Sequence, residues 1–409
     1  MPDPRPLRIL HFADAHIDIA NFGRHDPATA LPVRVMDFLA SLDQIVDTAI
    51  STPVDLVLFA GDAYKDRNPQ PTFQKAWGQR IIRLSQAGIP TLLLVGNHDV
   101  MPAAGRAHTL HEFETLRVPH IHVADRIRLF SPSDLGLPLQ ILAVPWITRS
   151  ALMTREDVAG KSLDEIHQAI EERVEERIEG LLQQSDPTLP LILTAHATIR
   201  GAAYGSERTV MLGHELVLSP AVVKQASFDY VALGHIHCHQ ELNRGSRPPV
   251  VYPGSIERIN FGEARETKGF VLADIEKGRA SWEFVTLKTR PHLDLRPETR
   301  AADSLMTDIL AQLPETAQVA GAICRVQLSY PREWEPLLDE SAIFAYLEPA
   351  HSVHILKTPQ GGPRSRLGEG LDVEGMSPAD LLEVYWKTTE LDEAEVVTLQ
   401  RLAAEILAE

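Results

Sequence analysis

The sequence predicts a layered α/β protein with more than one domain. Through about residue 285, apolar runs of strand length alternate with segments of helical periodicity, which is the pattern of a sheet covered by helices. Five of the apolar runs end in side chains that commonly bind metals. The texture changes after Arg290, and a chain of 409 residues usually exceeds one domain.

The strands are expected where the apolar runs lie. The five runs that precede metal-ligand side chains cover residues 7–12, 54–60, 91–95, 191–194 and 230–233. Their continuous apolar character indicates buried strands. Four further runs make the second half of this region richer in strands, and they cover residues 139–144, 250–252, 270–275 and 282–287.

Three segments place their apolar residues on one stripe of a helix. They cover residues 33–50, 73–84 and 166–181, and Gly180 lies near the end of the third. Because these helices alternate with the strands, we expect one α/β domain over residues 1–287.

A small α+β module is expected over residues 288–357. Its predicted elements are a helix at 302–312, a strand at 322–328, a helix at 340–347 and a strand at 351–356. Residues 358–376 are rich in Gly, Pro and charge, which is typical of a flexible linker.

Two amphipathic helices are predicted in the last segment, residues 377–409. Ser377 suits the N-cap of the first helix and Pro378 its first position. Two such helices bury their apolar faces poorly on each other alone, so we interpret the segment as a docking element for another protein. The alternative is that the helices fold back on the main domain.

Composition and charge exclude some classes of protein. No apolar run approaches the roughly 20 residues that span a bilayer, and the start of the chain does not resemble a signal peptide. Two cysteines, Cys238 and Cys324, imply no disulfide framework, so a cytoplasmic location is expected. With 39 basic and 56 acidic residues the net charge is −17, which argues against strong DNA binding by this chain alone. Bound divalent cations would reverse the local potential at a site.

Five clusters of candidate metal ligands follow the first set of predicted strands. The clusters are Asp14-Ala15-His16, Gly61-Asp62, Gly96-Asn97-His98-Asp99, His196 and Gly234-His235-Ile236-His237. Ligands in open α/β folds bind at the carboxyl ends of strands, so we expect these side chains to form one site.

The residue types indicate which ions this site would bind. Carboxylates, an amide oxygen and imidazoles without a required thiolate suit Mn²⁺, Fe²⁺ or Zn²⁺ better than Mg²⁺ or Ca²⁺. There are enough ligands for two ions if one carboxylate bridges them, and two ions can clamp a phosphate. The glycines before Asp62, Asn97 and His235 are expected to free the backbone for the turn that aims each ligand inward.

In this order, the five clusters resemble the motifs of the calcineurin-like metallophosphoesterase superfamily. The resemblance covers about residues 7–287 and implies a two-layer β-sandwich flanked by helices. It implies that one metal is held by Asp14, His16, Asp62 and His237. It implies that the other is held by Asp62 as the bridge, Asn97, His196 and His235. His98 would contact the scissile phosphate and protonate the leaving oxygen, and Asp99 would orient His98.

Three further features resemble the nuclease-subunit family of SbcC–SbcD DNA-repair complexes. They are the segments Gly61–Pro69 and Tyr252–Gly269, and the order of phosphoesterase domain, cap, linker and helix pair. The resemblance implies a Mn²⁺-dependent DNA exonuclease and endonuclease acting on DNA ends and hairpins by hydroxide attack. It also implies a homodimer whose residues 377–409 bind an SMC-like ATPase. The first alternative is a stand-alone phosphoesterase acting on cyclic nucleotides, phosphoproteins or small phosphates. A scaffold with a decayed site is disfavoured because every motif position is present.

Some other residues are candidates for DNA contact, and several histidines are not. Phosphate contacts are considered for the loop residues Arg106, Arg244, Arg247 and Arg258, and base stacking for Tyr64 and Tyr204. A core role is expected for His11, and no ligand role for Cys238 and His239. Surface positions without a shared setting are expected for His108, His111, His120 and His122.

Overall fold

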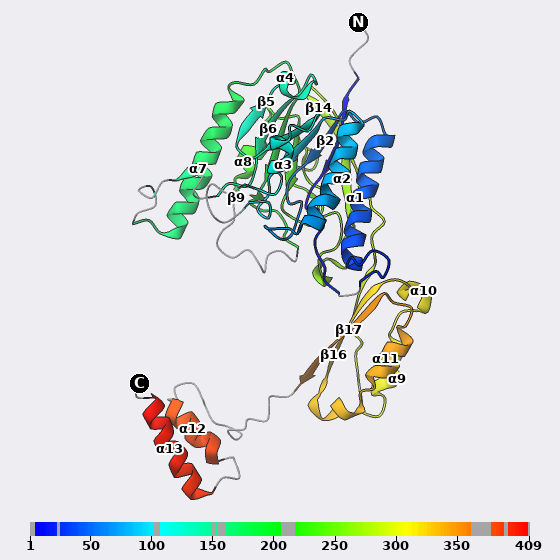
Figure 1. The fold of residues 1–409 in the computed structure, drawn as a ribbon, viewed down its shortest axis with the longest axis vertical. Coiled ribbons are helices and arrows are strands. Elements are labelled where there is room, and N and C mark those ends of the chain that lie inside the picture. Colours follow the sequence, from blue (N-terminus) through cyan, green and yellow to red (C-terminus); the bar gives the residue numbers. More distant parts are fainter. Residues whose placement is uncertain are drawn as a thin grey trace. The chain divides into compact units, whose positions relative to one another are not determined.

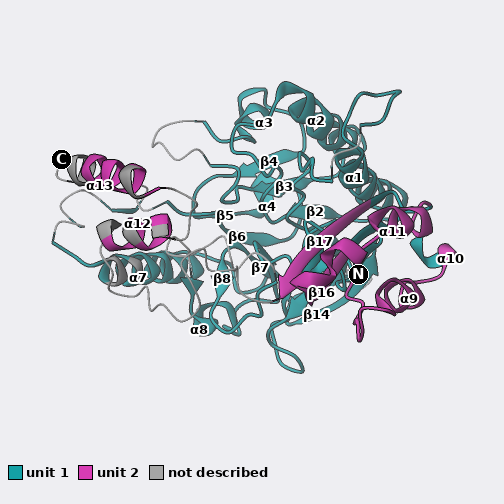
Figure 2. Cartoon of the chain, turned by 90° about the horizontal axis from the view of Figure 1, so that it is seen from below, with its two compact units in different colours: residues 1–294, 317–325, 349–352 teal, residues 295–316, 326–348, 353–409 magenta. Residues whose placement is uncertain are grey.

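The computed structural model describes residues 5–22, 25–100, 107–148, 152–153, 157, 160–205, 217–360, 378–387 and 392–407 (Figure 1). The chain divides into two compact units (Figure 2). The first unit comprises Met1–Asp294, Ala317–Arg325 and Pro349–Ser352, and the second comprises Leu295–Thr316, Val326–Glu348 and Val353–Glu409. Among the helices of the described residues, none is long and apolar enough to cross a membrane.

Two six-stranded sheets form the first unit. The first sheet has the order β14-β13-β1-β2-β3-β4. Its parallel strands are β1 (Leu7–Phe12), β2 (Leu56–Phe59), β3 (Thr91–Leu94) and β4 (Ile121–Ala124). The antiparallel hairpin of β13 (Gly269–Glu276) and β14 (Arg279–Thr286) extends the sheet beside β1.

The second sheet has the order β11-β12-β10-β7-β6-β5. Its parallel strands are β12 (Val250–Tyr252), β10 (Tyr230–Gly234), β7 (Leu191–His196) and β6 (Gln140–Val144). The antiparallel edge strands are β11 (Gln240–Glu241) and β5 (Arg128–Phe130), and the separate pair β8 (Thr198–Ile199) and β9 (Val217–Leu218) forms a small ribbon.

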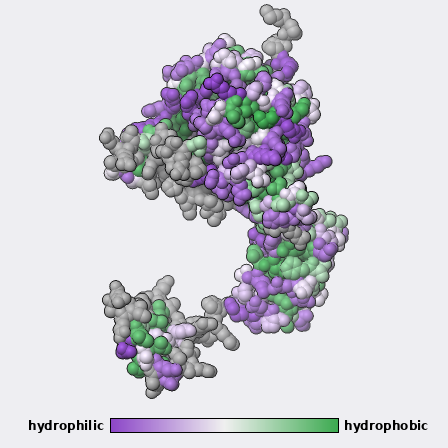
Figure 3. Space-filling model, viewed as in Figure 1, coloured by the Kyte–Doolittle hydropathy of each residue, from purple (hydrophilic) through white to green (hydrophobic). Residues whose placement is uncertain are grey.

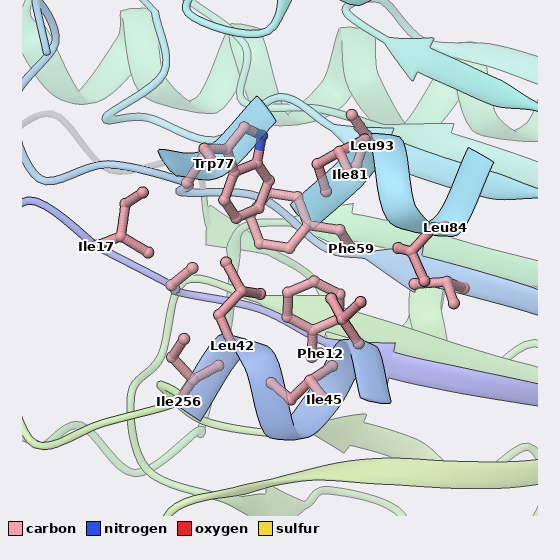
Figure 4. Packing of buried hydrophobic residues seen from close by; sticks show 14 of the residues in the cluster. Phe12, Ile17, Leu42, Ile45, Phe59, Trp77, Ile81, Leu84, Leu93 and Ile256 are labelled. Atoms are coloured by element: carbon pink, nitrogen blue, oxygen red, sulfur yellow. The ribbon is translucent and has the colours of Figure 1, made fainter. Parts of the chain in front are cut away.

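The alternation of side chains along the strands creates three apolar layers. In β1, Ile9 packs between the two sheets, whereas Leu10 and Phe12 pack on the helix side. Figure 4 shows the helix-side layer, where Phe12 lies among residues that include Phe59 and Trp77. The predicted two-layer β-sandwich flanked by helices is therefore confirmed.

The helices of the first unit cover the outer faces of the two sheets. They are α1 (Val33–Ser51), α2 (Pro71–Gln86), α3 (His111–Thr115), α4 (Pro132–Leu135), α7 (Leu163–Leu182), α8 (Pro220–Val223) and the 3₁₀ turn η2 (Phe261–Glu263). Helices α1 and α2 pack on the first sheet, and α7 packs on the second. A capping box at Ser162 and Glu165 starts α7.

His11 joins the two sheets, as expected for a core histidine. Its side chain is buried, with Nδ1 3.1 Å from the Tyr230 hydroxyl and Nε2 3.1 Å from the Leu233 carbonyl. Burial lowers the pKa of His11 to about 3, so the ring is neutral. The expectation that His11 has a core role is confirmed.

After residue 290 the elements are shorter. A three-stranded sheet has the order β15-β16-β17, and α12 packs against α13. The elements are β15 (His292–Leu295), α9 (Leu305–Ala311), α10 (Thr316–Val319), β16 (Ile323–Pro331), η3 (Arg332–Leu337), α11 (Glu340–Tyr346), β17 (Ser352–Gln360), α12 (Pro378–Lys387) and α13 (Glu393–Leu407).

Some predicted boundaries differ from the structure. Strand β17 continues to Gln360, past the predicted start of the linker at residue 358. Part of the predicted cap, residues 317–325 and 349–352, is grouped with the first unit. The prediction that Pro378 opens the first C-terminal helix is confirmed. Ser377 and residues 361–376 lie outside the described residues.

Candidate metal centre

The candidate ligands gather where five parallel strands end. They follow β1, β2 and β3 of the first sheet, and lie at or just beyond the ends of β7 and β10 of the second. Four of them have left-handed backbone conformations, with φ of 50° at Asp14, 41° at His16, 65° at Asp62 and 100° at His235. Non-glycine residues rarely adopt positive φ, and such strain is concentrated at functional sites.

The glycines before the ligands serve mainly close approach. Gly61 has a φ of 101°, but Gly96 and Gly234 are absent from the positive-φ positions. A Cβ atom on Gly96 would collide with the Asp62 carboxylate, and one on Gly234 would collide with the Ala60 carbonyl. The expectation that all three glycines supply turning freedom is therefore wrong for two of them, because there they give room for the neighbouring segment.

One group of ligands comes from β1 and from the segment after β10. Oxygen or nitrogen atoms of Asp14, His16 and His237 lie within 4.8 Å of one another. His16 Nε2 is 3.3 Å from His237 Nε2 and 4.0 Å from Asp14 Oδ1. His16 Nε2 is also 3.8 Å from Asp62 Oδ2, which brings the expected bridging carboxylate to this group.

The second group surrounds Asn97. Its Oδ1 lies 3.0 Å from His196 Nε2 and 3.0 Å from His235 Nδ1. His196 Nε2 is 3.4 Å from Asp62 Oδ2. The seven predicted metal ligands are thus brought together, and Asp62 lies between the two groups.

Hydrogen bonds fix the ring nitrogen that each of three histidines directs into the site. An imidazole nitrogen that faces an acceptor oxygen must carry the hydrogen. The pairs are His16 Nδ1 with the Tyr64 carbonyl (3.1 Å), His196 Nδ1 with the Ala60 carbonyl (2.7 Å) and His237 Nδ1 with Glu263 Oε1 (3.1 Å).

The donor set that results fits divalent cations. In the neutral tautomers, His16 and His237 direct the lone pairs of Nε2 at each other, and His196 directs its lone pair at the Asn97 oxygen. Such acceptor pairs repel unless a proton or a cation lies between them. Imidazole, carboxylate and amide ligands are the set that Mn²⁺, Fe²⁺ and Zn²⁺ accept.

The pKa values of the metal-free site show the same demand for positive charge. Burial, which alone would lower the pKa of His196, is outweighed by Asp62 and Asp14, so this pKa is raised to about 9. Burial raises the pKa of Asp14 to about 7. Burial also acts to raise the pKa of Asp62, but His196 and His98 hold it well below its usual value. Bound cations replace such protons, because metal ligands must be deprotonated.

His98 lies beside the ligands and has a fixed orientation. Its Nδ1 is 2.8 Å from the Lys65 carbonyl, and its backbone N–H donates to Asp62 Oδ1 at 2.8 Å. Its ring meets the ring of His16 edge-on, with centroids 5.2 Å apart. Because Nδ1 donates to a carbonyl, Nε2 is the nitrogen that can exchange a proton with a substrate.

Asp99 does not orient His98 through its carboxylate. The carboxylate accepts backbone N–H bonds from Asp62 (2.9 Å), Ala63 (3.2 Å) and Gly96 (2.9 Å), and the Thr109 hydroxyl donates to it at 2.9 Å. Burial raises its pKa to about 6. The role inferred for Asp99 from its sequence neighbour is therefore wrong: Asp99 fastens the two ligand-bearing loops to each other.

Glu263 and Lys268 support His237, a role that the sequence did not assign. Glu263 Oε1 lies 3.1 Å from His237 Nδ1, and Glu263 Oε2 lies 2.7 Å from Lys268 Nζ. Lys268 also donates to the His237 carbonyl at 3.1 Å and pairs with Glu266 at 2.7 Å. Metal-binding histidines commonly donate their second nitrogen to a carboxylate, which fixes their tautomer.

The candidate DNA contacts have different outcomes. Tyr64 has 0% exposed surface and packs near Trp77, so base stacking by Tyr64 is incompatible with this structure. Arg258 donates four hydrogen bonds within the chain, to Ala264, Glu266, Thr289 and Arg290, which contradicts its expected phosphate contact. Arg244, Arg247 and Tyr204 are exposed and stay predictions, whereas Arg106 lies outside the described residues.

A cleft opens beside His98. It has a volume of about 1060 Å³, and its lining includes His98, Lys65, Arg67, His25 and Phe73. Lys65 and Arg67 belong to the segment after Asp62, whose potential for phosphate contact was not recognised in the sequence. Trp146 is a second residue without a sequence signal, and its ring lies 5.2 Å from that of His235.

Comparison with known proteins supports these motifs. The chain is 26% identical over 280 residues to the SbcD subunit of the nuclease SbcCD from Escherichia coli (strain K12), covering 67% of this chain and 66% of that protein. It is 25% identical over 288 residues to the Bacillus subtilis (strain 168) protein of the same name, covering 69% and 70%. It is also 25% identical over 280 residues to "Uncharacterized metallophosphoesterase YhaO" of Bacillus subtilis, covering 68% and 60%.

The first and third of these matches span less than two thirds of the relative's length. Residues 7–239, which contain all the candidate ligands, match the model of the calcineurin-like phosphoesterase family. This match covers more than half of the 409 residues. The chain therefore belongs to the calcineurin-like phosphoesterase family.

Proposed function

We propose that the chain is a Mn²⁺-dependent DNA exonuclease and endonuclease that uses two metal ions. The observation that carries the proposal is the convergence of seven ligands and His98 at one end of a cleft with cationic side chains. Similarity to the two proteins named as SbcCD nuclease subunits supports DNA as the substrate class.

The proposed division of labour follows from the donor set. Asp14, His16, Asp62 and His237 would hold one ion, and Asp62, Asn97, His196 and His235 would hold the other. When bound, such ions supply a nucleophilic hydroxide at neutral pH and neutralise the charge of the phosphate. His98, held through Nδ1 by the Lys65 carbonyl, would contact the scissile phosphate through Nε2 and give a proton to the leaving oxygen.

The cleft is the proposed path of the DNA strand. Lys65, Arg67 and His25 can face successive phosphates, and Phe73 offers an aromatic surface. Few cations line this path and the net charge is −17, so the DNA affinity of the chain alone should be weak. Each phosphate contact adds about −0.9 to the slope of log K against log salt.

The partner is proposed to be an SbcC-like SMC-type ATPase that binds residues 377–409. Apolar side chains remain exposed on the two helices, among them Tyr385 (37%), Val397 (64%) and Leu402 (41%) (Figure 3). Exposed apolar residues of this kind mark protein interaction sites. The complex would be built on a homodimer of this chain in the cytoplasm, associated with the nucleoid.

The nuclease proposal is tested with full-length protein and Mn²⁺ on linear duplex DNA, hairpin DNA and bis-p-nitrophenyl phosphate. Asn97→Ala should abolish cleavage of all three substrates, because it removes an amide oxygen shared by two histidines. Lys65→Gln with Arg67→Gln should lower DNA cleavage more than ester hydrolysis. The Lys65 substitution keeps the backbone carbonyl that orients His98.

Hydrolysis of the small ester without DNA cleavage, even with the ATPase present, would support the stand-alone phosphoesterase instead. That alternative is kept because one relative of similar identity is named only as a metallophosphoesterase. For the partner, deletion of residues 377–409 should abolish co-purification with the ATPase and leave Mn²⁺-dependent ester hydrolysis intact. Partner binding that survives the deletion would refute the docking assignment.

A further inference from the structure

We propose that His108, His111 and Glu114 form a binding site for one Zn²⁺ ion, separate from the metal centre. The three residues lie on and just before α3, a surface helix of the first unit. Their spacing of three residues brings them to one side of a helical turn. In the sequence the two histidines have no shared setting, and the fold supplies one.

The geometry is close to that of an assembled site. One ligand atom from each residue lies within 4.8 Å of the other two. His111 Nδ1 is 3.9 Å from Glu114 Oε2, and the rings of His108 and His111 meet edge-on at 5.2 Å. Zinc–ligand bonds are about 2.0–2.2 Å long, so only small side-chain movements would bring the three atoms around one ion.

His108 gives the second, independent observation. Both of its ring nitrogens are buried, and neither has a hydrogen-bond partner among the described residues. A buried polar group without a partner is destabilising, and an ion is one of the few agents that removes this cost. Burial lowers the pKa of His108, which keeps the ring in the neutral form that binds metals.

The ligand types select the ion. Two imidazoles and one carboxylate, with no further protein ligand required, are a common zinc set that leaves a fourth position for water. A cavity of about 510 Å³ opens beside His108, His111 and Glu112, which leaves room for that water. A bare ion pair between His111 and Glu114 would leave the His108 nitrogens unexplained and, at this exposure, would contribute little to stability.

The site would fasten the segment that supports Asp99. Thr109 follows His108 directly, and it donates its hydroxyl to the Asp99 carboxylate at 2.9 Å and its backbone N–H to the Asp99 carbonyl at 3.0 Å. A zinc ion on His108 and His111 would hold both sides of this residue.

The test is the number of zinc ions bound per chain. Full-length protein is dialysed against buffered free Zn²⁺, and bound zinc is counted by mass spectrometry of the metal. The variant His111→Asn with Glu114→Gln should bind one ion fewer. Each single substitution should weaken this site by more than the roughly 10–100-fold that losing an outer-shell partner costs. Both side chains are about half exposed, so neither change should unfold the protein.

His120→Asn is the matched control. His120 is an exposed histidine with a φ of 62°, which asparagine tolerates, and the variant should keep the full zinc count. Anomalous diffraction at the zinc edge should place a peak among the three side chains. An unchanged zinc count in the double variant would overturn the proposal, as would an equal loss in His120→Asn. Because the readout is zinc stoichiometry, failure of the nuclease proposal would leave this result unaffected.

Discussion

Glu263→Gln should weaken metal binding by the group of Asp14, His16 and His237. The carboxylate accepts from His237 Nδ1 on one oxygen and pairs with Lys268 on the other. An amide cannot replace both contacts. If its oxygen faces His237, its NH₂ group faces the Lys268 ammonium. If the amide is flipped, the NH₂ group faces His237 Nδ1 and drives the proton to Nε2, where it blocks the metal.

The expected magnitude follows from the same contacts. Losing an outer-shell carboxylate typically costs about 10–100-fold in metal affinity, which corresponds to about 1.4–2.8 kcal/mol. Breaking a buried ion pair can cost about 3–5 kcal/mol of stability. Here the loss should be smaller, about 1–3 kcal/mol, because Lys268 keeps Glu266 at 2.7 Å and Ser255 Oγ at 2.8 Å.

The assays are calorimetric titration with Mn²⁺ and urea unfolding in EDTA. Glu266→Gln is the matched control, because Glu266 pairs with the same lysine, whereas Glu263 is the carboxylate that accepts from His237. It should lower the free energy of unfolding without changing metal affinity. Wild-type affinity in Glu263→Gln would refute the tautomer reasoning. An equal loss of affinity in Glu266→Gln would show that the effect passes through Lys268.

Three further predictions concern the loops and the ions. Asp99→Asn should lower the free energy of unfolding in EDTA by about 2–4 kcal/mol, because an amide cannot accept all four hydrogen bonds; unchanged stability with lost catalysis would instead restore a catalytic role. Gly96→Ala should reduce Mn²⁺ affinity at least about tenfold, because the added Cβ collides with Asp62. Gly78→Ala, in open space within α2, should stabilise the protein by about 1 kcal/mol in the same urea titration. Saturation with Mn²⁺ at 100 times its Kd should add about 2.7 kcal/mol to the unfolding free energy, reversed by EDTA; an unchanged melting temperature would contradict binding to the native state.

The fold and the ligands could be predicted because both leave local patterns in the sequence. Apolar runs mark buried strands, and a ligand that follows such a run must lie at a sheet edge. The short strands β4, β5 and β11 were not predicted, since their polar residues mask the apolar run, as His122 does in β4. The end of β17 was missed because its last residues resemble a linker in composition.

The errors at the site have a different cause. Tyr64 follows a ligand motif and carries a stacking ring, but burial decides its role and burial depends on α2. Asp99 adjoins His98 in sequence, yet their side chains bind different partners. Neighbours in a turn commonly point apart, so adjacency in sequence is poor evidence for a side-chain contact.

The segment from Ala60 to Lys65 explains why the histidines of this site are oriented as they are. The carbonyls of Ala60, Tyr64 and Lys65 accept the Nδ1 hydrogens of His196, His16 and His98, respectively. One loop thus sets the tautomers of three histidines from three strands, and its own Asp62 lies between the two ligand groups. Only the Asp62 side chain is needed for this, because the other positions act through backbone atoms. The conformation of the loop is therefore what must be preserved, and the Asp99 carboxylate fixes it by binding the backbone N–H groups of Asp62 and Ala63.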